Sequence, residues 1–122
     1  MIGYITVGTN DLLRATAFYD KLFDVLGGSR LMETDRGIFW TFGPAAAAFG
    51  VMKPFDEQPA SVGNGVMIAL SMSSKKEVDQ IYKAALSLGA PDEGAPGQRS
   101  DNFYSCYFRD LDGNKLGAFY MS

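Results

Sequence analysis

The sequence predicts an α+β fold of two similar βαβββ units, each with one helix on a mixed, curved sheet. The order of strand, helix and strands that begins at Tyr4 recurs from Met67, and each copy holds one stretch of apolar residues at helical spacing. The chain closes with a strand, a tight turn and a strand, which is typical of a β-hairpin. If each helix covers one face of its sheet, the opposite faces are left to meet around a cleft, where ligands commonly bind.

The first unit begins with a strand and a helix. Residues 2–8 alternate between apolar and polar types, which predicts a strand. Asn10 or Asp11 can cap the helix that follows, and Gly27-Gly28 ends it. The apolar residues of this helix recur at spacings of three and four: Leu12, Ala15, Tyr19, Leu22, Phe23 and Leu26.

Three more strands are predicted in the first half. Residues 29–34 suit a short strand, and residues 38–42 form a strongly β-prone run. Residues 45–52 contain four alanines, which favour a helix. Because Gly43-Pro44 and Pro54 leave too little room for a stable helix, a strand is the favoured prediction there.

The second unit repeats this order. Residues 65–71 predict a strand, and Ser74 with Glu77 has the spacing of a capping box at the start of a helix. The apolar stripe of that helix is Val78, Ile81, Tyr82, Ala85 and Leu88. Gly89 ends it. Residues 91–100 are rich in glycine and proline and predict at most a short strand.

The middle and the end of the chain complete the organisation. Residues 54–63 read as a linker, which divides a single domain of 122 residues into units 1–53 and 64–122. Near the end, residues 103–109 predict a strand, and Asp112-Gly113-Asn114 supplies residues that tolerate the positive φ of a tight turn.

Composition excludes several classes of function. The net charge is −3 and no cluster of Lys or Arg exists, which argues against a nucleic-acid partner. No run is long enough to span a bilayer and no export signal is present, so we expect no membrane and a cytoplasmic location. The chain has no histidine and a single cysteine, Cys106, which excludes an internal disulfide and a Cys/His zinc site.

Three segments have a distinctive sequence: residues 1–11 with Ala17-Phe18-Tyr19-Asp20, residues 53–60 followed by Gly63-Asn64-Gly65, and residues 107–116. In these segments the chain resembles the vicinal oxygen chelate superfamily, which comprises glyoxalase I, bleomycin-resistance proteins and extradiol dioxygenases. The closing segment resembles the family's hairpin, with Leu111 where proline is usual. The resemblance implies the two-unit fold, a small-molecule ligand and a homodimer.

The resemblance also implies positions for metal ligands. In metal-dependent members the histidine of the first strand falls on Tyr4, a second ligand falls on Met67, and a glutamate after the hairpin falls on Gly117. A fourth ligand would come from residues 36–55, which contain no acid. None of these residues offers the imidazole or hard anionic oxygen that a divalent ion of this class needs, so we expect no metal cofactor.

Strand alternation gives an independent prediction of which side chains face the cleft. Ile5 and Val7 suit the helix-covered face of their strand, and Leu116 and Ala118 do so in the last strand. The residues expected in the cleft, and therefore proposed to bind a ligand, are Tyr4, Thr6, Met67, Ser105, Tyr107, Gly117 and Phe119. Gly117 would make the cleft roomier.

Four of the candidate residues also have a structural interpretation. Trp40 is a candidate stacking platform for a ligand, but core packing is the favoured interpretation of this tryptophan. Tyr4 suits either a ligand contact or a half-buried sheet edge, and Met67 either a pocket wall or a core gap-filler. Cys106 has no histidine to activate it, which favours an inert thiol.

The hypothesis with most support is a metal-free protein that binds a small apolar or aromatic molecule. A metal-dependent lyase, isomerase or dioxygenase with non-standard ligands is the main alternative. A metal-free enzyme with Tyr4 or Tyr107 as acid or base, and a protein-interaction module, also stay open. A tyrosine is a poor base unless its site lowers its pKa from about 10.

Overall fold

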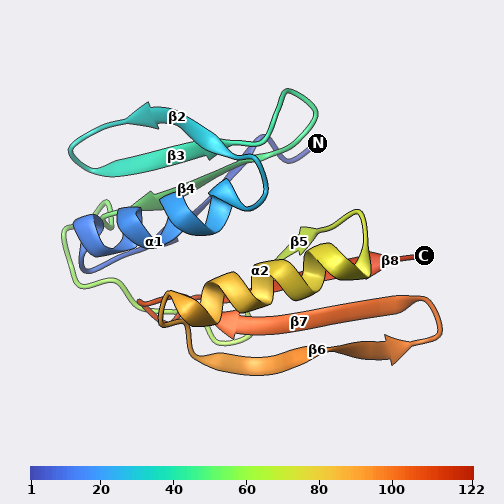
Figure 1. The fold of residues 1–122 in the computed structure, drawn as a ribbon. Coiled ribbons are helices and arrows are strands. Elements are labelled where there is room, and N and C mark those ends of the chain that lie inside the picture. Colours follow the sequence, from blue (N-terminus) through green and yellow to red (C-terminus); the bar gives the residue numbers. More distant parts are fainter. The chain divides into compact units, whose positions relative to one another are not determined.

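A computed structural model describes all residues from 1 to 122. The chain forms two compact units, Met1–Val62 and Gly63–Ser122. Each unit has one helix along one face of a four-stranded sheet (Figure 1). The prediction of an α+β fold with two βαβββ units is confirmed.

The first unit has its strands in the order β1-β4-β3-β2, with β1 parallel to β4 and the other neighbours antiparallel. Its elements are β1 (Tyr4–Gly8), α1 (Leu12–Asp24), β2 (Ser29–Glu33), β3 (Gly37–Thr41) and β4 (Ala48–Met52). The ambiguous stretch 45–52 thus holds a strand, because its last residues pair with both β1 and β3.

The second unit has the equivalent order, β5-β8-β7-β6, with β5 parallel to β8. Its elements are β5 (Ile68–Ser71), α2 (Lys75–Ser87), β6 (Asp92–Ser100), β7 (Phe103–Arg109) and β8 (Lys115–Met121).

The prediction of at most a short strand over residues 91–100 is wrong, since β6 is nine residues long. Its pairing with β7 shifts register three times, between Asp92 and Gly94, between Gly94 and Gly97, and between Gln98 and Ser100. Glycine and proline are compatible with a strand when it lies at a sheet edge and contains bulges. The breaker residues therefore mark irregularities within a strand here.

The core of the first unit is a cluster of aromatic rings between α1 and the sheet. Tyr19 and Phe23 of α1 pack against Trp40 and Phe49, with ring centroids 4.9 to 5.7 Å apart. All four side chains are buried. Burial of such rings contributes about 1.5–3 kcal/mol each, which makes this cluster the main source of cohesion in the unit.

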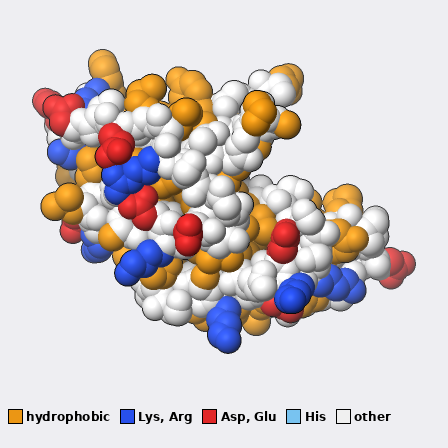
Figure 2. Space-filling view, turned by 45° about the horizontal axis from the view of Figure 1, so that its top comes forward, with side chains coloured by type: hydrophobic (Ala, Val, Ile, Leu, Met, Phe, Trp, Pro, Cys, Tyr) orange, Lys and Arg blue, Asp and Glu red, His pale blue; other side chains and the backbone are white.

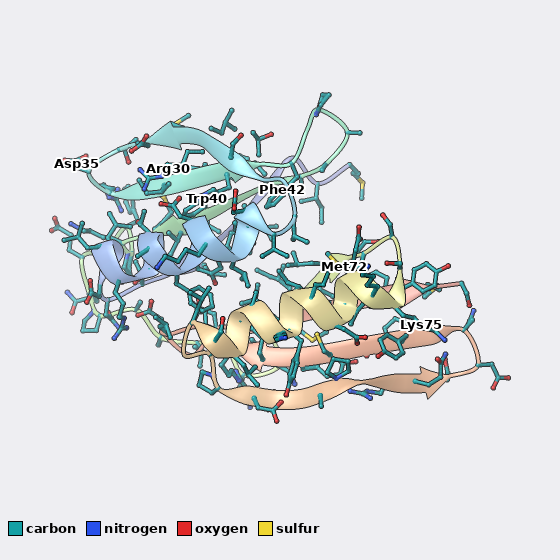
Figure 3. All side chains as sticks on the ribbon, in the orientation of Figure 1. Arg30, Asp35, Trp40, Phe42, Met72 and Lys75 are labelled. Carbon is teal, nitrogen blue, oxygen red and sulfur yellow. The ribbon has the colours of Figure 1, made fainter.

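A polar network fixes the edge of this cluster. The indole nitrogen of Trp40 donates to Asp20 at 2.9 Å, and Arg30 holds the same carboxylate through two nitrogens at 3.0 and 2.6 Å. Figure 3 labels Trp40 and Arg30 beside α1. The hydrogen bond from Arg30 keeps the pKa of Asp20 below its usual value, so this carboxylate stays ionised at neutral pH.

The second unit has a smaller aliphatic core. The buried residues of α2 are Val78, Ile81 and Ala85, and those of the sheet beneath it are Cys106, Phe108, Leu116 and Ala118. These strand residues alternate with the ones on the opposite face, as predicted from the sequence.

The closing turn is organised by one buried carboxylate. An oxygen of Asp110 accepts hydrogen bonds from the backbone amides of Asp112 and Asn114, and its other oxygen accepts from the side chain of Asn114. Gly113 has a φ of 90°, which glycine adopts without strain. The Asp-Gly-Asn sequence is thus a turn, as predicted.

Residues 54–62 group with the first unit. The side chain of Asn10 exchanges two hydrogen bonds with the backbone of Ala60, at 2.6 and 3.1 Å. Arg36 lies over the ring of Phe55 and donates to the carbonyl of Lys53. These contacts attach the proline-containing segment to the first sheet.

Both helices have 13 residues, and neither is long and apolar enough to cross a membrane. Acidic and basic side chains are interspersed on the face in Figure 2, with no extended block of one sign.

The cap of α2 at Ser74 gives a test of the stability of the second unit. The Ser74 hydroxyl accepts from the amide of Glu77, whose carboxylate accepts from the amide of Ser73. We expect Ser74→Ala to lower the free energy of unfolding by about 1 kcal/mol, because a helix amide loses its partner. Urea denaturation followed by circular dichroism measures this. Ser73→Ala is the matched control, since Ser73 contributes only its backbone, and an equal loss in both variants would contradict the capping role.

Candidate functional site

Each sheet has one face covered by its own helix and an opposite face that the helix leaves free, called here the open face of the unit. In the second unit the Cys106 thiol contacts the carbonyl of Val78, and the Tyr104 hydroxyl donates to Asp79 of α2. Residues 105 and 107 therefore belong to the open face. In the first unit Trp40 and Phe49 lie on the helix side, so Phe39 and Gly50 belong to the open face.

On the open face of the first unit, an aromatic ring covers a glycine. Phe39 pairs with Gly50, and a Cβ on Gly50 would lie 2.5 Å from the Phe39 ring. Tyr4 meets Phe39 edge to face, with ring centroids 5.5 Å apart, and remains 66% exposed. Thr6 of β1 pairs with Gly50 from the strand opposite β3, and its side chain is exposed.

The open face of the second unit repeats this arrangement. Tyr107 pairs with Gly117, and a Cβ on Gly117 would lie 3.1 Å from its ring. A Cβ on Gly94 would also lie 3.1 Å from the ring, at its other edge. The ring therefore spans three strands, β6, β7 and β8. Gly117 does not enlarge the site as expected from the sequence, because Tyr107 fills the space that its missing side chain leaves.

Further side chains complete the second open face. The buried Ser105 donates from its hydroxyl to the Tyr107 oxygen at 3.0 Å. Phe119, opposite Ser105, stacks on Phe103 with centroids 5.4 Å apart. The structure thus brings four of the predicted residues together in this unit: Ser105, Tyr107, Gly117 and Phe119.

Two predicted residues have different surroundings. Met67 precedes β5 and belongs to no strand, and it is 43% exposed. Trp40 is 1% exposed and lies among the rings beneath α1, which matches its alternative interpretation as a core residue. It offers no surface on which a ligand could stack.

Three further residues of the open faces were not predicted from the sequence: Phe39, Arg99 and Lys115. Phe39 follows from alternation, since it lies between the core residues Ile38 and Trp40. Lys115 shares a face with Gly117 two residues along β8. Arg99 could not be placed, because the bulges of β6 break the alternation that assigns its face.

The two basic residues flank Tyr107. The guanidinium carbon of Arg99 lies 5.6 Å from the centre of the Tyr107 ring, and the Lys115 ammonium lies 5.5 Å from it. Both distances are within the range of a cation–π contact.

The residues at the implied ligand positions do not fit a divalent metal ion. No group of three His, Cys, Asp or Glu side chains is arranged to hold one. Gly117 has no donor atom, and its space is taken by a ring. On the second open face the carboxylate of Glu93 is bonded to Arg109 at 2.7 Å, and this bond lowers the pKa of Glu93.

A hollow of about 510 Å³ in the first unit lies at the start of α1. It contains none of the predicted site residues. Its charged residues balance, with Arg36 and Lys53 against Asp35 and Glu57. The other lining residues are Thr9, Asn10, Leu12, Pro54, Gln58 and Pro59.

Comparison with known proteins gives a consistent result. The sequence model of the Glyoxalase/Bleomycin resistance protein/Dioxygenase superfamily matches residues 1–117. A glyoxalase/bleomycin resistance protein from Albidiferax ferrireducens is 34% identical, with a TM-score of 0.92, and the match covers 100% of this chain and 99% of that one. No curated protein matches the chain.

More distant structures share the fold. A lactoylglutathione lyase from Agrobacterium tumefaciens is 23% identical, with a TM-score of 0.73 and coverage of 98% of this chain and 92% of that one. A fosfomycin resistance protein from Listeria monocytogenes is 21% identical, with a TM-score of 0.75 and coverage of 100% and 93%.

The aromatic cover of the glycines gives a second test. We expect Gly50→Ala to destabilise the protein by about 1–3 kcal/mol, because the new methyl group meets the ring of Phe39. Gly3→Ala is the control, since a Cβ there has no atom within 4 Å. In a double-mutant cycle measured by urea denaturation, Phe39→Ala should remove most of the cost of Gly50→Ala. Strictly additive effects would show that the ring does not cover the glycine.

The single thiol gives a third test. Burial raises the pKa of Cys106 to about 11, so about a thousandth of it is thiolate at pH 8. We expect iodoacetamide to alkylate the folded protein at least about 100-fold more slowly than the urea-unfolded protein at that pH. Mass spectrometry follows the reaction, with Cys106→Ser as the blank. Equal rates would mean that the thiol is accessible and its pKa ordinary.

Proposed function

The chain belongs to the Glyoxalase/Bleomycin resistance protein/Dioxygenase superfamily, and from this premise we propose that it binds a small apolar or aromatic molecule without a catalytic metal. Each unit has its own proposed binding residues. On the open face of the first unit they are Tyr4 and Thr6, and on the open face of the second they are Ser105, Tyr107, Gly117 and Phe119.

One observation carries this proposal. At Gly117, where the resemblance implies a metal-binding glutamate, the ring of Tyr107 lies against the backbone. A Cβ at position 117 would lie 3.1 Å from the ring, which would have to shift by a few tenths of an ångström to admit a side chain. The other two implied positions hold a phenol, Tyr4, and a thioether, Met67, and a hard divalent cation prefers neither.

The chemistry of the open faces supports the same proposal. In both units the middle of the face is an aromatic ring over a glycine, with further rings beside it, Tyr4 in the first and Phe119 in the second. Flat rings at the middle of each open face suit the burial of an apolar molecule. The hydroxyls of Tyr4, Thr6 and Tyr107 supply the hydrogen-bonding groups that orient a ligand. Ser105 is fully buried and contributes through its hydrogen bond to Tyr107.

A screen for ligands tests the proposal. We expect members of a library of aromatic metabolites and drugs to raise the melting temperature, because a ligand at 100 times its Kd stabilises by about 2.7 kcal/mol. Tyr4→Ala and Phe119→Leu should reduce the shift. Leu13→Ala is the control, because Leu13 is 86% exposed on α1 and outside both open faces.

The same assay with Mn²⁺, Fe²⁺, Ni²⁺ and Zn²⁺ tests the alternative of a metal-dependent enzyme. We expect no gain in melting temperature and no stoichiometric metal after dialysis. Tight binding of one ion per chain with a gain of stability would overturn the metal-free proposal. A library without a single hit would overturn ligand binding and favour a protein-interaction module.

A further inference from the structure

We propose that the molecule bound on the open face of the second unit is an aromatic carboxylate, and that Arg99 and Lys115 recognise its carboxylate beside the ring of Tyr107. This inference rests on the proposed ligand-binding function and specifies the ligand's chemical class.

Arg99 and Lys115 reach the same aromatic ring from two different strands. Arg99 comes from β6 and Lys115 from β8, the strands on either side of Tyr107. Both cationic groups nevertheless lie within 5.6 Å of the centre of one ring. An anionic group placed at this ring would therefore be attracted by both cations.

Neither Arg99 nor Lys115 has an acidic partner. Of the nearby basic residues, Arg109 is paired with Glu93 at 2.7 Å, whereas Arg99 and Lys115 form no ion pair. The Glu93 carboxylate is near enough for Lys115 to contribute to its lowered pKa, but its hydrogen bond goes to Arg109. In a chain of net charge −3 this is a local excess of positive charge.

The side chain of Arg99 is held in place by a contact within its own strand. One guanidinium nitrogen donates to the carbonyl of Ala95 at 2.7 Å, which turns the side chain back along its own strand. A Cβ on Gly97 would lie 2.6 Å from the other terminal nitrogen, and a Cβ on Gly94 would lie 3.5 Å from the first. The two glycines thus leave the space that the guanidinium occupies, and a positioned guanidinium can bind both oxygens of a carboxylate.

The rings of Tyr107 and Phe119 offer a surface for the apolar part of the ligand. The Ser105 hydroxyl is hydrogen-bonded to the Tyr107 oxygen at 3.0 Å, and a phenol oxygen in such a pair can form a further hydrogen bond with a ligand oxygen. Phe119 lies two residues from Gly117 on the same face of β8 and is stacked on Phe103. A flat, apolar body can therefore lie along these rings while its carboxylate reaches the cations.

Paired probes test this inference. We compare benzoate with benzamide, which has nearly the same shape and no charge, by isothermal titration calorimetry of the full chain at low salt. We expect benzoate to bind about tenfold more tightly, or about 1.4 kcal/mol. Arg99→Gln and Lys115→Gln should each weaken benzoate binding several-fold and leave benzamide unchanged. Lys83→Gln, an exposed charge on α2, is the matched control and should change neither.

The outcomes separate this inference from the proposed function. Equal affinities of benzoate and benzamide, or benzoate binding that both substitutions leave intact, would overturn the carboxylate inference and leave ligand binding standing. Absence of benzoate binding would also overturn it, and the library screen then decides the proposed function independently. Melting curves of the two variants confirm that each is folded.

Discussion

The packing of each helix against its own sheet is the constraint on which the other features depend. Once α1 covers Trp40 and Phe49, and α2 covers Cys106 and Phe108, alternation along the regular strands assigns the side chains of the opposite faces, and the bulges of β2 and β6 are the exceptions. The apolar stripes of the helices thus determine both the cores and the surfaces available for binding.

Much of the fold follows from the sequence because its signals are local. The cap at Ser74, the turn around Asp110 and the apolar stripes of both helices each need only residues within a few positions. Strand 48–52 could be predicted from the lack of room for a helix. The nine-residue β6 could not, because its glycines and Pro96 serve bulges that only the pairing with β7 reveals.

The site was less predictable than the fold, because its geometry is non-local. Alternation assigned Ser105, Tyr107, Gly117 and Phe119 to one face, but the position of the Tyr107 ring depends on a neighbouring strand. An absent side chain does not create space when an adjacent ring can occupy it. Arg99 was out of reach for a related reason, since a bulge changes the face on which every later residue of the strand lies.

The ring of Tyr107 limits which residues can replace Gly117. A Cβ at position 117 would lie 3.1 Å from that ring, so a side chain there requires the Tyr107 ring to give way by a few tenths of an ångström. Removal of the ring first would expose the backbone of two glycines and sacrifice packing on three strands. Positions 107 and 117 are therefore coupled, because the effect of a side chain at position 117 on stability depends on the residue at position 107.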